Sequence, residues 1–523
     1  MSTEAAASQA FWPSGTEAVG ADVSTRKAAP ALLDRLLETG EIGAPAARSG
    51  KLAEFLSAES PAEALRTWFD GKVPAGRDEV ARALNRAVAR IDDLLGQQLN
   101  AILHQPVFQK LEAAWRGLAY LVREAHESGD SHIKVRCFPA SWKEIENDFE
   151  GSLDFDQSTL FRRIYEDEFG IAGGRPLGVL LADYEVRPGP VRGYPHNDIQ
   201  IMQSLSQVAA AAFCPTILNA GPALFGLERF DSLERELDLE STFDRLDYLK
   251  WRALRDTEDA RFLGLALPHV LMRLPYEDHS NGAAPFRFVE DVSAADRSGY
   301  LWGGAAFALG GVLIRAFADC GWFADIRGVE RGVLGGGLVT GLPAHEFGTD
   351  APGVATKAST DVIVTDQLEK QLCELGFISL CRCYDTPYSA FYSAPSIQRP
   401  KRYDSADAAI NARISAMLHY MLCIGRFAHI LKVYGRDLIG NYSTPAEIET
   451  ELQRWLSNYV TPDDDANTET KSRRPLRDAS VSIVPDPAKP GSYRVALRLM
   501  PHYQFDDAKA SITLVTELAS RSN

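Results

Sequence analysis

Cys381 and Cys383 are the residues whose type and spacing come closest to half of a metal site. They are separated by one residue in a stretch expected to be a strand, so both thiols would point to the same face. A closed zinc site needs four ligands, and the ten histidines offer no spaced pair nearby. Free cysteines are often buried as small apolar residues, so we interpret both as core residues and expect no metal.

Two further candidate sites also lack the partners that a reaction requires. Gly335, Gly336 and Gly337 form a run that no lysine follows, so a plain turn is favoured over a phosphate cradle. His196 and Asp198 follow a Pro/Gly loop, but no nucleophile is tied to them, and Asp198 is well placed as a helix N-cap. The sequence also contains no Walker, zinc-protease or nucleophile-elbow motif. We therefore expect no catalytic residue and no cofactor.

Residues 247–261 are dense in both signs of charge. On a helix, the arginines could pair with the carboxylates at a spacing of three or four residues. The residues concerned are Arg252 and Arg255, and Asp256, Glu258 and Asp259. A solvated helix face is the simplest interpretation of this pattern. The alternative is an ion-pair interface between subunits, in which mixed charge sets the register.

Composition limits the class of protein and its compartment. The 523 residues have a formal net charge of −16, which argues against nucleic-acid binding because that depends on clustered lysine and arginine. Seven scattered cysteines fit a reducing compartment better than a disulfide framework. The N-terminus lacks a secretory signal pattern, and the longest apolar run, Tyr300–Ile314, is too short to cross a membrane. We expect a cytoplasmic protein with no membrane insertion, and a tightly packed buried element at Tyr300–Ile314.

The N-terminal stretch 1–78 is rich in Ala, Gly, Ser and Pro, and most of it is expected to form a flexible arm. One amphipathic island interrupts it between Pro30 and Gly40, which suit a helix start and a helix stop. Its apolar stripe consists of Leu32, Leu33, Leu36 and Leu37. A helix this short is marginal by itself, so it either docks on a partner's groove or packs on its own domain.

The body of the chain changes from helical to alternating helix and strand. Helical periodicity is strong over Asp78–Glu127, where Phe108, Leu111, Trp115, Leu118 and Val122 form a stripe expected to be core or helix-pairing. The expected strands are Ile133–Phe138, Pro176–Asp183 and Pro215–Asn219, and the expected helical stretches are Trp142–Phe169, Asp198–Phe213 and Ala406–Tyr434. This alternation predicts an α/β core with a partly parallel sheet.

The tail has a strand-like pattern. A polar, acidic linker at 462–472 precedes three expected strands at 479–484, 493–499 and 512–518. Tyr493, Val495, Leu497 and Leu499 alternate with polar or small residues at a clean period of two. The edges of so small a β-element expose backbone groups, which strands of another chain could satisfy.

Several long segments together resemble the large subunit of the bacterial type VI secretion sheath, the TssC/VipB (EvpB) family. The resemblance rests on the segments Leu94–Val122, Asp154–Val186 and Trp251–Tyr276, and on Arg474–Leu476 and Leu499–Phe505 in the tail. The resemblance covers residues 80–518. It implies a structural subunit that forms a heterodimer with the small sheath subunit, TssB/VipA. These heterodimers polymerise with neighbouring protomers around an inner tube of ring proteins on a baseplate, and contraction propels the tube.

The resemblance also implies which residues make the connections. C-terminal strands of the large subunit join strands from small subunits of neighbouring protomers, which here points to Val481, Ile483, Tyr493, Val495, Leu497 and Leu499. An AAA+ unfoldase that recycles contracted sheath recognises an N-terminal helix. The matching residues here are Leu32, Leu33, Leu36 and Leu37.

The expected organisation has four parts: an arm at 1–78 with a docking helix at 30–40, an α/β domain at 79–390, a mainly helical part with an acidic linker at 391–470, and a β-element at 471–523. Two alternatives to the sheath subunit remain. The first is an α/β enzyme whose site is assembled from dispersed residues, which predicts a deep pocket with titratable groups of perturbed pKa. The second is a baseplate or adaptor component of the same machine.

Overall fold

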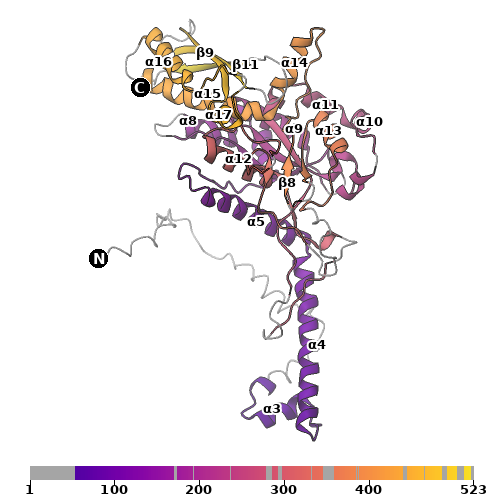
Figure 1. Cartoon of the computed structure of the whole chain (residues 1–523). Helices are drawn as coiled ribbons and strands as arrows, with labels where there is room; N and C mark the ends of the chain where they lie inside the picture. The colour runs from indigo at the N-terminus through magenta and orange to yellow at the C-terminus, as the bar shows by residue number, and fades with distance from the viewer. Residues whose placement is uncertain are drawn as a thin grey trace, which may run out of the picture. The chain divides into compact units, whose positions relative to one another are not determined.

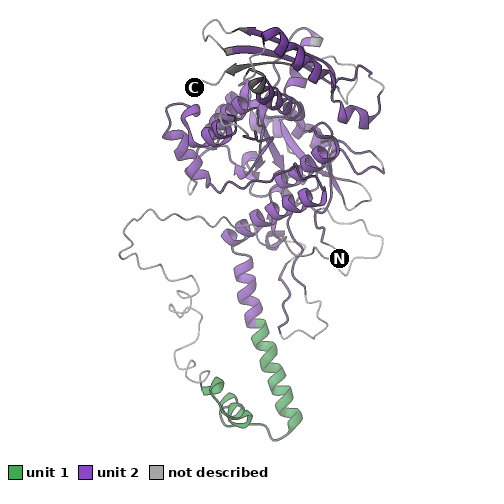
Figure 2. Ribbon diagram, turned by 90° about the vertical axis from the view of Figure 1, so that its left-hand side faces the viewer, with its two compact units in different colours: residues 1–93 green, residues 94–523 purple. Residues whose placement is uncertain are grey.

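The computed structural model describes residues 54–523 with short gaps. The gaps are residues 170–173, 192–193, 236, 278–285, 293–296, 331, 346–358, 384–385, 387, 440–443, 464–465, 486–491, 503–511 and 520–523. The expected docking helix at 30–40 therefore lies outside the described residues. The chain divides into two compact units, residues 1–93 and 94–523 (Figure 2).

The described part of the first unit contains α3 (Pro61–Trp68) and the beginning of α4 (Arg77–Leu103), within or next to the stretch expected to be a flexible arm. The Ser60 hydroxyl caps α3 by accepting a hydrogen bond from the Glu63 amide, and Pro61 occupies the first turn. None of the eight residues of α3 is buried. A ring contact between Phe55 and Trp68, with centroids 5.2 Å apart, packs the helix against the residues just before it.

A six-stranded sheet organises the second unit (Figure 1). The strand order is β1-β2-β3-β7-β8-β6, in which β1, β2, β3 and β7 run parallel and β8 is antiparallel to both of its neighbours. The bounds are β1 (Leu180–Val186), β2 (Thr216–Ala220), β3 (Leu263–Leu267), β6 (Leu338–Val339), β7 (Phe377–Arg382) and β8 (Ser389–Phe391). A separate two-stranded sheet pairs β4 (Val270–Leu271) with β5 (Trp302–Gly303).

Both faces of the central strands are covered, which explains why β2 and β3 are buried along their whole length. Leu263 and Leu265 face one hydrophobic core, which α9 (Asp198–Ala212) covers with Met202. Ala266 faces a second core on the opposite side, where α12 (Ala305–Cys320) lies. β3 therefore has a continuous apolar run, Leu263–Leu267, instead of an alternating pattern.

α12 contains most of the expected apolar run and is deeply buried against α5 (Pro106–Glu127). Small residues let the two helices approach closely. A Cβ added to Gly310 would lie 2.7 Å from Leu121 Cδ2, and one added to Gly311 would lie 2.5 Å from the Tyr120 hydroxyl. The expectation of a tightly packed buried element is confirmed.

Shorter helices fill the connections. The remaining α-helices before the tail are α6 (Trp142–Glu150), α7 (Thr159–Phe161), α8 (Asp167–Phe169), α10 (Leu239–Phe243), α11 (Leu249–Arg255) and α13 (Asp366–Glu374). A π-helix, Arg162–Glu166, joins α7 to α8. The short 3-10 helices are Phe155–Gln157, Pro222–Phe225, Phe230–Glu234, Leu246–Tyr248, Asp259–Phe262 and Arg297–Gly299.

The C-terminal part consists of helices and a second sheet. Its helices are α14 (Ala406–Ser415), α15 (Leu418–Ile439), α16 (Pro445–Ser457) and α17 (Thr468–Arg473). The antiparallel sheet has the order β11-β10-β9, with β9 (Leu476–Pro485), β10 (Ser492–Pro501) and β11 (Ile512–Ala519). The three expected tail strands are confirmed, and side chains of β9 and β10 share a core with α15 and α16.

Four expectations about local structure are wrong. The helical stretch Trp142–Phe169 is interrupted between α6 and α7, where only the 3-10 helix Phe155–Gln157 forms. Ile133–Phe138 is not a strand, because its alternating pattern has no partner strand within the described part of the chain. The polar linker at 462–472 contains α17, which Asn467 caps by accepting from the Thr470 amide. The helical stretch from Ala406 divides into α14 and α15 around Ala416 and Met417. The α/β fold class itself is confirmed. Within the described residues, every helix is too short or too polar to span a bilayer.

Candidate assembly interface

The six tail residues expected in strand pairing lie on β9 and β10. Val481, Ile483, Val495, Leu497 and Leu499 are buried, whereas Tyr493 is half-buried. Their side chains face α15 and α16 in a shared core. Pairing with another chain would therefore use the backbone at the edges of this sheet, while these side chains hold the sheet on its own subunit. Their assignment to the inter-subunit connection stays a prediction.

The stripe on α5 differs from the expected core face. Leu111 is 56% exposed and Trp115 is 64% exposed, and Val107 and Val122 are exposed beside them. The opposite face, which includes Gly117, is the one that packs on α12. The core alternative is therefore wrong for Leu111, Trp115 and Val122, and the helix-pairing alternative stays a prediction. A helix this apolar on both sides leaves an exposed apolar face of the kind that marks contact sites.

The charged segment 247–261 forms ion pairs across the fold and not along one helix. α11 ends at Arg255, so the carboxylates follow the helix, and the Arg252 guanidinium donates to the Phe243 carbonyl at 2.7 Å. Asp256 binds Arg399 through two contacts of 2.9 and 2.7 Å. The expected pairing of Arg252 and Arg255 with the carboxylates of residues 256–259 along one helix is wrong.

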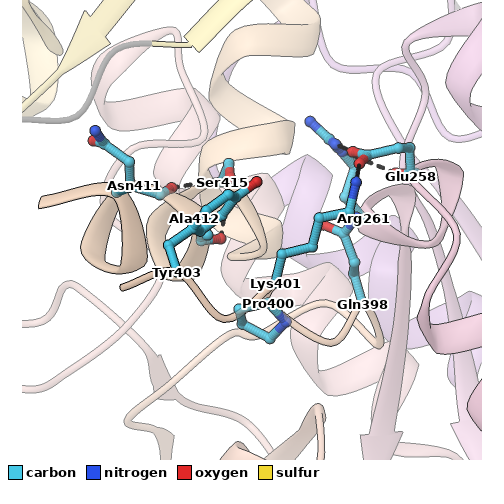
Figure 3. Close-up of a pocket in the computed structure, with 10 residues that line it drawn as sticks. Glu258, Arg261, Gln398, Pro400, Lys401, Tyr403, Asn411, Ala412 and Ser415 are labelled. Carbon is cyan, nitrogen blue, oxygen red and sulfur yellow. Dashed lines mark hydrogen bonds and ion pairs between the residues drawn. The ribbon is translucent and has the colours of Figure 1, made fainter. Parts of the chain in front are cut away.

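A cavity of about 380 Å³ lies beside these ion pairs (Figure 3). Glu258, which binds both Arg261 and Lys401, stands at one side of it, and Asn411 and Ser415 of α14 stand at the other. Glu258 thus offsets one of the two lining cations, Arg261 and Lys401, and the charged side chains that line the cavity sum to one positive charge.

Two family models match consecutive parts of the chain. Residues 85–398 match the model described as EvpB/VC_A0108, tail sheath N-terminal domain. Residues 407–518 match the model described as EvpB/VC_A0108, tail sheath gpW/gp25-like domain. The chain belongs to this tail-sheath family. It is a structural subunit of the type VI secretion sheath, as its resemblance to the TssC/VipB proteins implied.

A curated relative agrees with the assignment to the sheath family. The type VI secretion system sheath protein TssC1 of Pseudomonas aeruginosa is 37% identical over 447 residues, which are 85% of this chain and 87% of the relative. A chain in the cryo-EM structure of the anti-feeding prophage baseplate also matches, with 10% identity and a TM-score of 0.30 over 62% of this chain and 63% of that one. That likeness is too low to support any conclusion.

The sheath subunit does contain a cluster of titratable groups at the carboxyl ends of its parallel strands. His269 follows β3, and its Nδ1 lies 2.8 Å from Asp361 Oδ2 while its Nε2 lies 3.0 Å from Glu185 Oε1. Burial opposes the charged imidazole, but the bonds to Asp361 and Glu185 outweigh it and raise the pKa of His269 to about 10. Because the two ring nitrogens bind the carboxylates of Asp361 and Glu185, this histidine connects β1, the end of β3 and the segment that contains Asp361.

Neighbouring polar groups extend this cluster into the core of the sheath subunit. Asn219 at the end of β2 donates to Asp183 Oδ1 at 3.1 Å and accepts from the amide of Ala306 at 3.0 Å. Burial raises the pKa of Asp183. The sequence analysis missed this network. The residues of this network lie far apart along the chain. The only sequence feature that indicates the network is therefore the presence of polar residues at the ends of buried strands.

His196 and Asp198 have structural roles in the sheath subunit. Asp198 is the first residue of α9 and Asn197 is the N-cap, so the expected N-cap is wrong by one residue. The buried Asp198 carboxylate accepts from Trp142 Nε1 at 2.8 Å and from the Arg187 amide at 2.9 Å. Burial raises its pKa against these bonds. His196 binds Glu146 of α6.

The remaining sequence candidates are also explained by packing. Cys381 is buried in β7, and burial raises the pKa of its thiol to about 12, so its interpretation as a core residue is confirmed. Cys383 follows β7 and is half-buried, with its Sγ 3.9 Å from the Tyr392 hydroxyl, so its interpretation as a core residue is wrong. Gly336 lies in a turn with a φ of +60°, and its amide donates a hydrogen bond to Asp325 Oδ2 at 3.0 Å. This geometry is as expected for a plain turn.

Proposed function

We propose that this sheath subunit polymerises with the small sheath subunit, TssB/VipA, around the inner tube, on a baseplate and with neighbouring protomers, and that its contraction propels the tube. Its membership of the tail-sheath family along nearly the whole chain carries this proposal. The exposed apolar face of α5 and the edge strands of the tail sheet supply surfaces suited to such contacts. A spring that releases once needs interfaces that differ in free energy between two lattices, and no chemical step.

The subunit is proposed to have no catalytic activity and to work in the cytoplasm. The network around His269 supports the first part, because both nitrogens of its ring are bound to carboxylates and neither is available to act as a base. The reducing compartment suggested by seven free cysteines supports the second.

The Leu32–Leu37 helix is proposed as the docking site of an AAA+ unfoldase that recycles contracted sheath. The support is its sequence pattern, an isolated apolar stripe within a stretch of small and polar residues. Its partner would be recognised through the four leucines, which fall on one side of a helix.

Co-expression with the small subunit tests the proposed function. The full chain is expected to form tubular polymers with that partner, visible by negative-stain electron microscopy. A soluble monomer that ignores the small subunit would overturn the proposal. Particles confined to one end of a tube assembled from other proteins would instead indicate a baseplate or adaptor component.

A further inference from the structure

Two segments from the middle of the chain, 272–276 and 286–292, lie together at the junction between α4 and α5. The Glu290 amide of the second segment donates to the Tyr276 carbonyl of the first at 2.9 Å. The rings of Tyr276 and Phe288 also meet, with centroids 6.3 Å apart. We call these two segments the strap, because they contact both helices.

The strap follows one side of the end of α4. Gly96 and Asn100 are four residues apart and therefore lie on the same side of the helix, and His104 follows the helix at the same spacing. A Cβ added to Gly96 would lie 3.9 Å from Phe288 Cδ2, and Asn100 Oδ1 accepts from the Asp291 amide at 3.0 Å. Two successive turns of α4 are thus in contact with residues that are distant in the sequence.

Glu290 is the most deeply buried charge of the strap, with a side chain only 1% exposed. It accepts from Arg273 Nη2 and from the Tyr276 amide, both at 3.0 Å, and its Oε1 lies 3.3 Å from His104 Nε2. Burial by itself would raise the pKa of Glu290, but the hydrogen bonds, led by that from Arg273, outweigh burial and lower it. The carboxylate is therefore charged and joins the strap to the end of α4.

Arg273 extends this connection to α5. Its Nε donates to Glu112 Oε1 at 2.8 Å, while its other nitrogens bind Glu290. Its guanidinium carbon also lies 4.3 Å from the centre of the Tyr276 ring. A planar guanidinium can bind two carboxylates and stack on a ring at the same time, whereas a lysine ammonium cannot.

Apolar packing contributes little to holding the end of α4. This helix, which the structure describes in full, has one buried residue, Leu103. Leu95, Ile102 and Val107, on both sides of the junction, are exposed. Buried ion pairs add little net stability because desolvation offsets their attraction, but they can specify one arrangement out of several. The charges of the strap are therefore suited to fixing a direction.

We propose that Arg273 and Glu290 are positioning residues, which fix the end of α4 and the start of α5 in one arrangement and so present the exposed faces of these helices for sheath assembly. The inference rests on the proposed function and assigns it an internal support, since neither residue needs to touch another subunit. Arg273 and His269 flank β4, so the strap also continues the polar connection that begins at the ends of β1 and β3.

Arg273→Lys tests the role of the guanidinium geometry, because it keeps the charge and loses the fork. In the free chain, the amides of 97–104 are expected to exchange with deuterium about tenfold faster, and the yield of tubes with the small subunit to fall about fivefold. Arg399→Lys is the matched control, because Arg399 also makes two bonds to one carboxylate, that of the half-exposed Asp256, outside the strap. Wild-type exchange and wild-type tube yield in Arg273→Lys would overturn the proposal.

A variant destabilised elsewhere separates position from stability. Ile378→Val removes a buried methyl group from β7 and is expected to lower the thermal midpoint while leaving tube yield at the wild-type level. An equal loss of tubes in Ile378→Val and Arg273→Lys would show that stability alone governs assembly. That result would also overturn the positioning role.

Glu290→Gln is the second variant, and it decides if Arg273→Lys does not fold. It keeps the size of the side chain and removes the charge, so the same faster exchange and the same loss of tubes are expected. If the wild-type chain forms no tubes with the small subunit, the proposed function fails, whatever the exchange shows. If the wild-type chain forms tubes and Glu290→Gln exchanges faster without losing them, the proposed function stands and the positioning role is overturned.

Discussion

His269 shows at the scale of single residues how the sheath body is fixed without catalytic chemistry. A charged imidazole between two carboxylates ties together three segments that lie far apart in the sequence. Losing the histidine would leave Asp361 facing Glu185 in a partly buried site. Since Glu185 is about half exposed, solvent moderates this cost.

We expect His269→Gln to lower the free energy of unfolding by about 2 kcal/mol at pH 7. The folded pKa is raised from 6.5 to about 10, so the contribution of His269 is fully present below pH 6.5 and is lost as the pH rises through 10. Thermal midpoints of wild type and variant should therefore converge between pH 7 and pH 10. His132→Gln, at a histidine whose side chain is 87% exposed, is the control. A constant difference across this range would contradict the prediction.

Two glycines provide a matched test of helix packing. A Cβ at Gly117 would lie 2.4 Å from Phe307 Cδ2, so Gly117→Ala is expected to destabilise the fold by about 1–3 kcal/mol. A Cβ at Gly96 of α4 would be 3.9 Å from Phe288, an ordinary contact. Gly96→Ala should therefore stabilise by up to about 1 kcal/mol through helix propensity. Urea unfolding measures both, and the same sign for the two variants would contradict this account.

At the scale of elements, α5 has two apolar faces with different functions. The face that includes Gly117, Tyr120 and Leu121 packs against α12, while the face around Trp115 stays open. Burying large apolar side chains yields more free energy than burying small ones. The open face is therefore suited to contact with another subunit of the sheath.

The face of α5 can be tested by charge. Trp115→Glu is expected to change the free energy of unfolding by no more than about 0.5 kcal/mol, because the side chain is exposed. Tube yield with the small subunit should fall strongly, since a carboxylate would be buried without a partner. Glu127→Gln, on the last turn of the same helix, is the control. Normal tube yield from Trp115→Glu would show that this face stays open in the sheath.

The elements also show what the sequence could and could not predict. The alternation of apolar and polar residues at Tyr493–Leu499 was sufficient to identify β10, because one face of this strand is buried and the other is more exposed. The same alternation at Ile133–Phe138 failed, since a pattern indicates a possible strand but not the partner that it needs. The periodicity of α5 correctly indicated a helix and could not say which of two apolar faces would be covered.

At the scale of the whole molecule, the tail and the docking arm are expected to act separately. Leu33→Asp or Leu36→Asp should abolish unfoldase binding, since each places a charge in the apolar stripe. Tube formation with the small subunit should be unchanged. Arg35→Asp is the control, because it introduces the same residue outside the stripe. Binding of the unfoldase to purified sheath, measured by co-sedimentation, would contradict the assignment if it survived both leucine changes.

The expected organisation set the tail apart as a connecting element behind a linker, but its sheet shares one core with the body of the second unit. Leu476, Val495 and Leu499 lie in the same cluster as Phe427, whose ring stacks on Trp322 with centroids 3.9 Å apart. A tensile force applied to this sheet would therefore load a broad packed interface in shear instead of a single flexible tether. The body of the subunit would therefore move together with the tail sheet, and little of the movement during contraction would be absorbed by stretching of a linker.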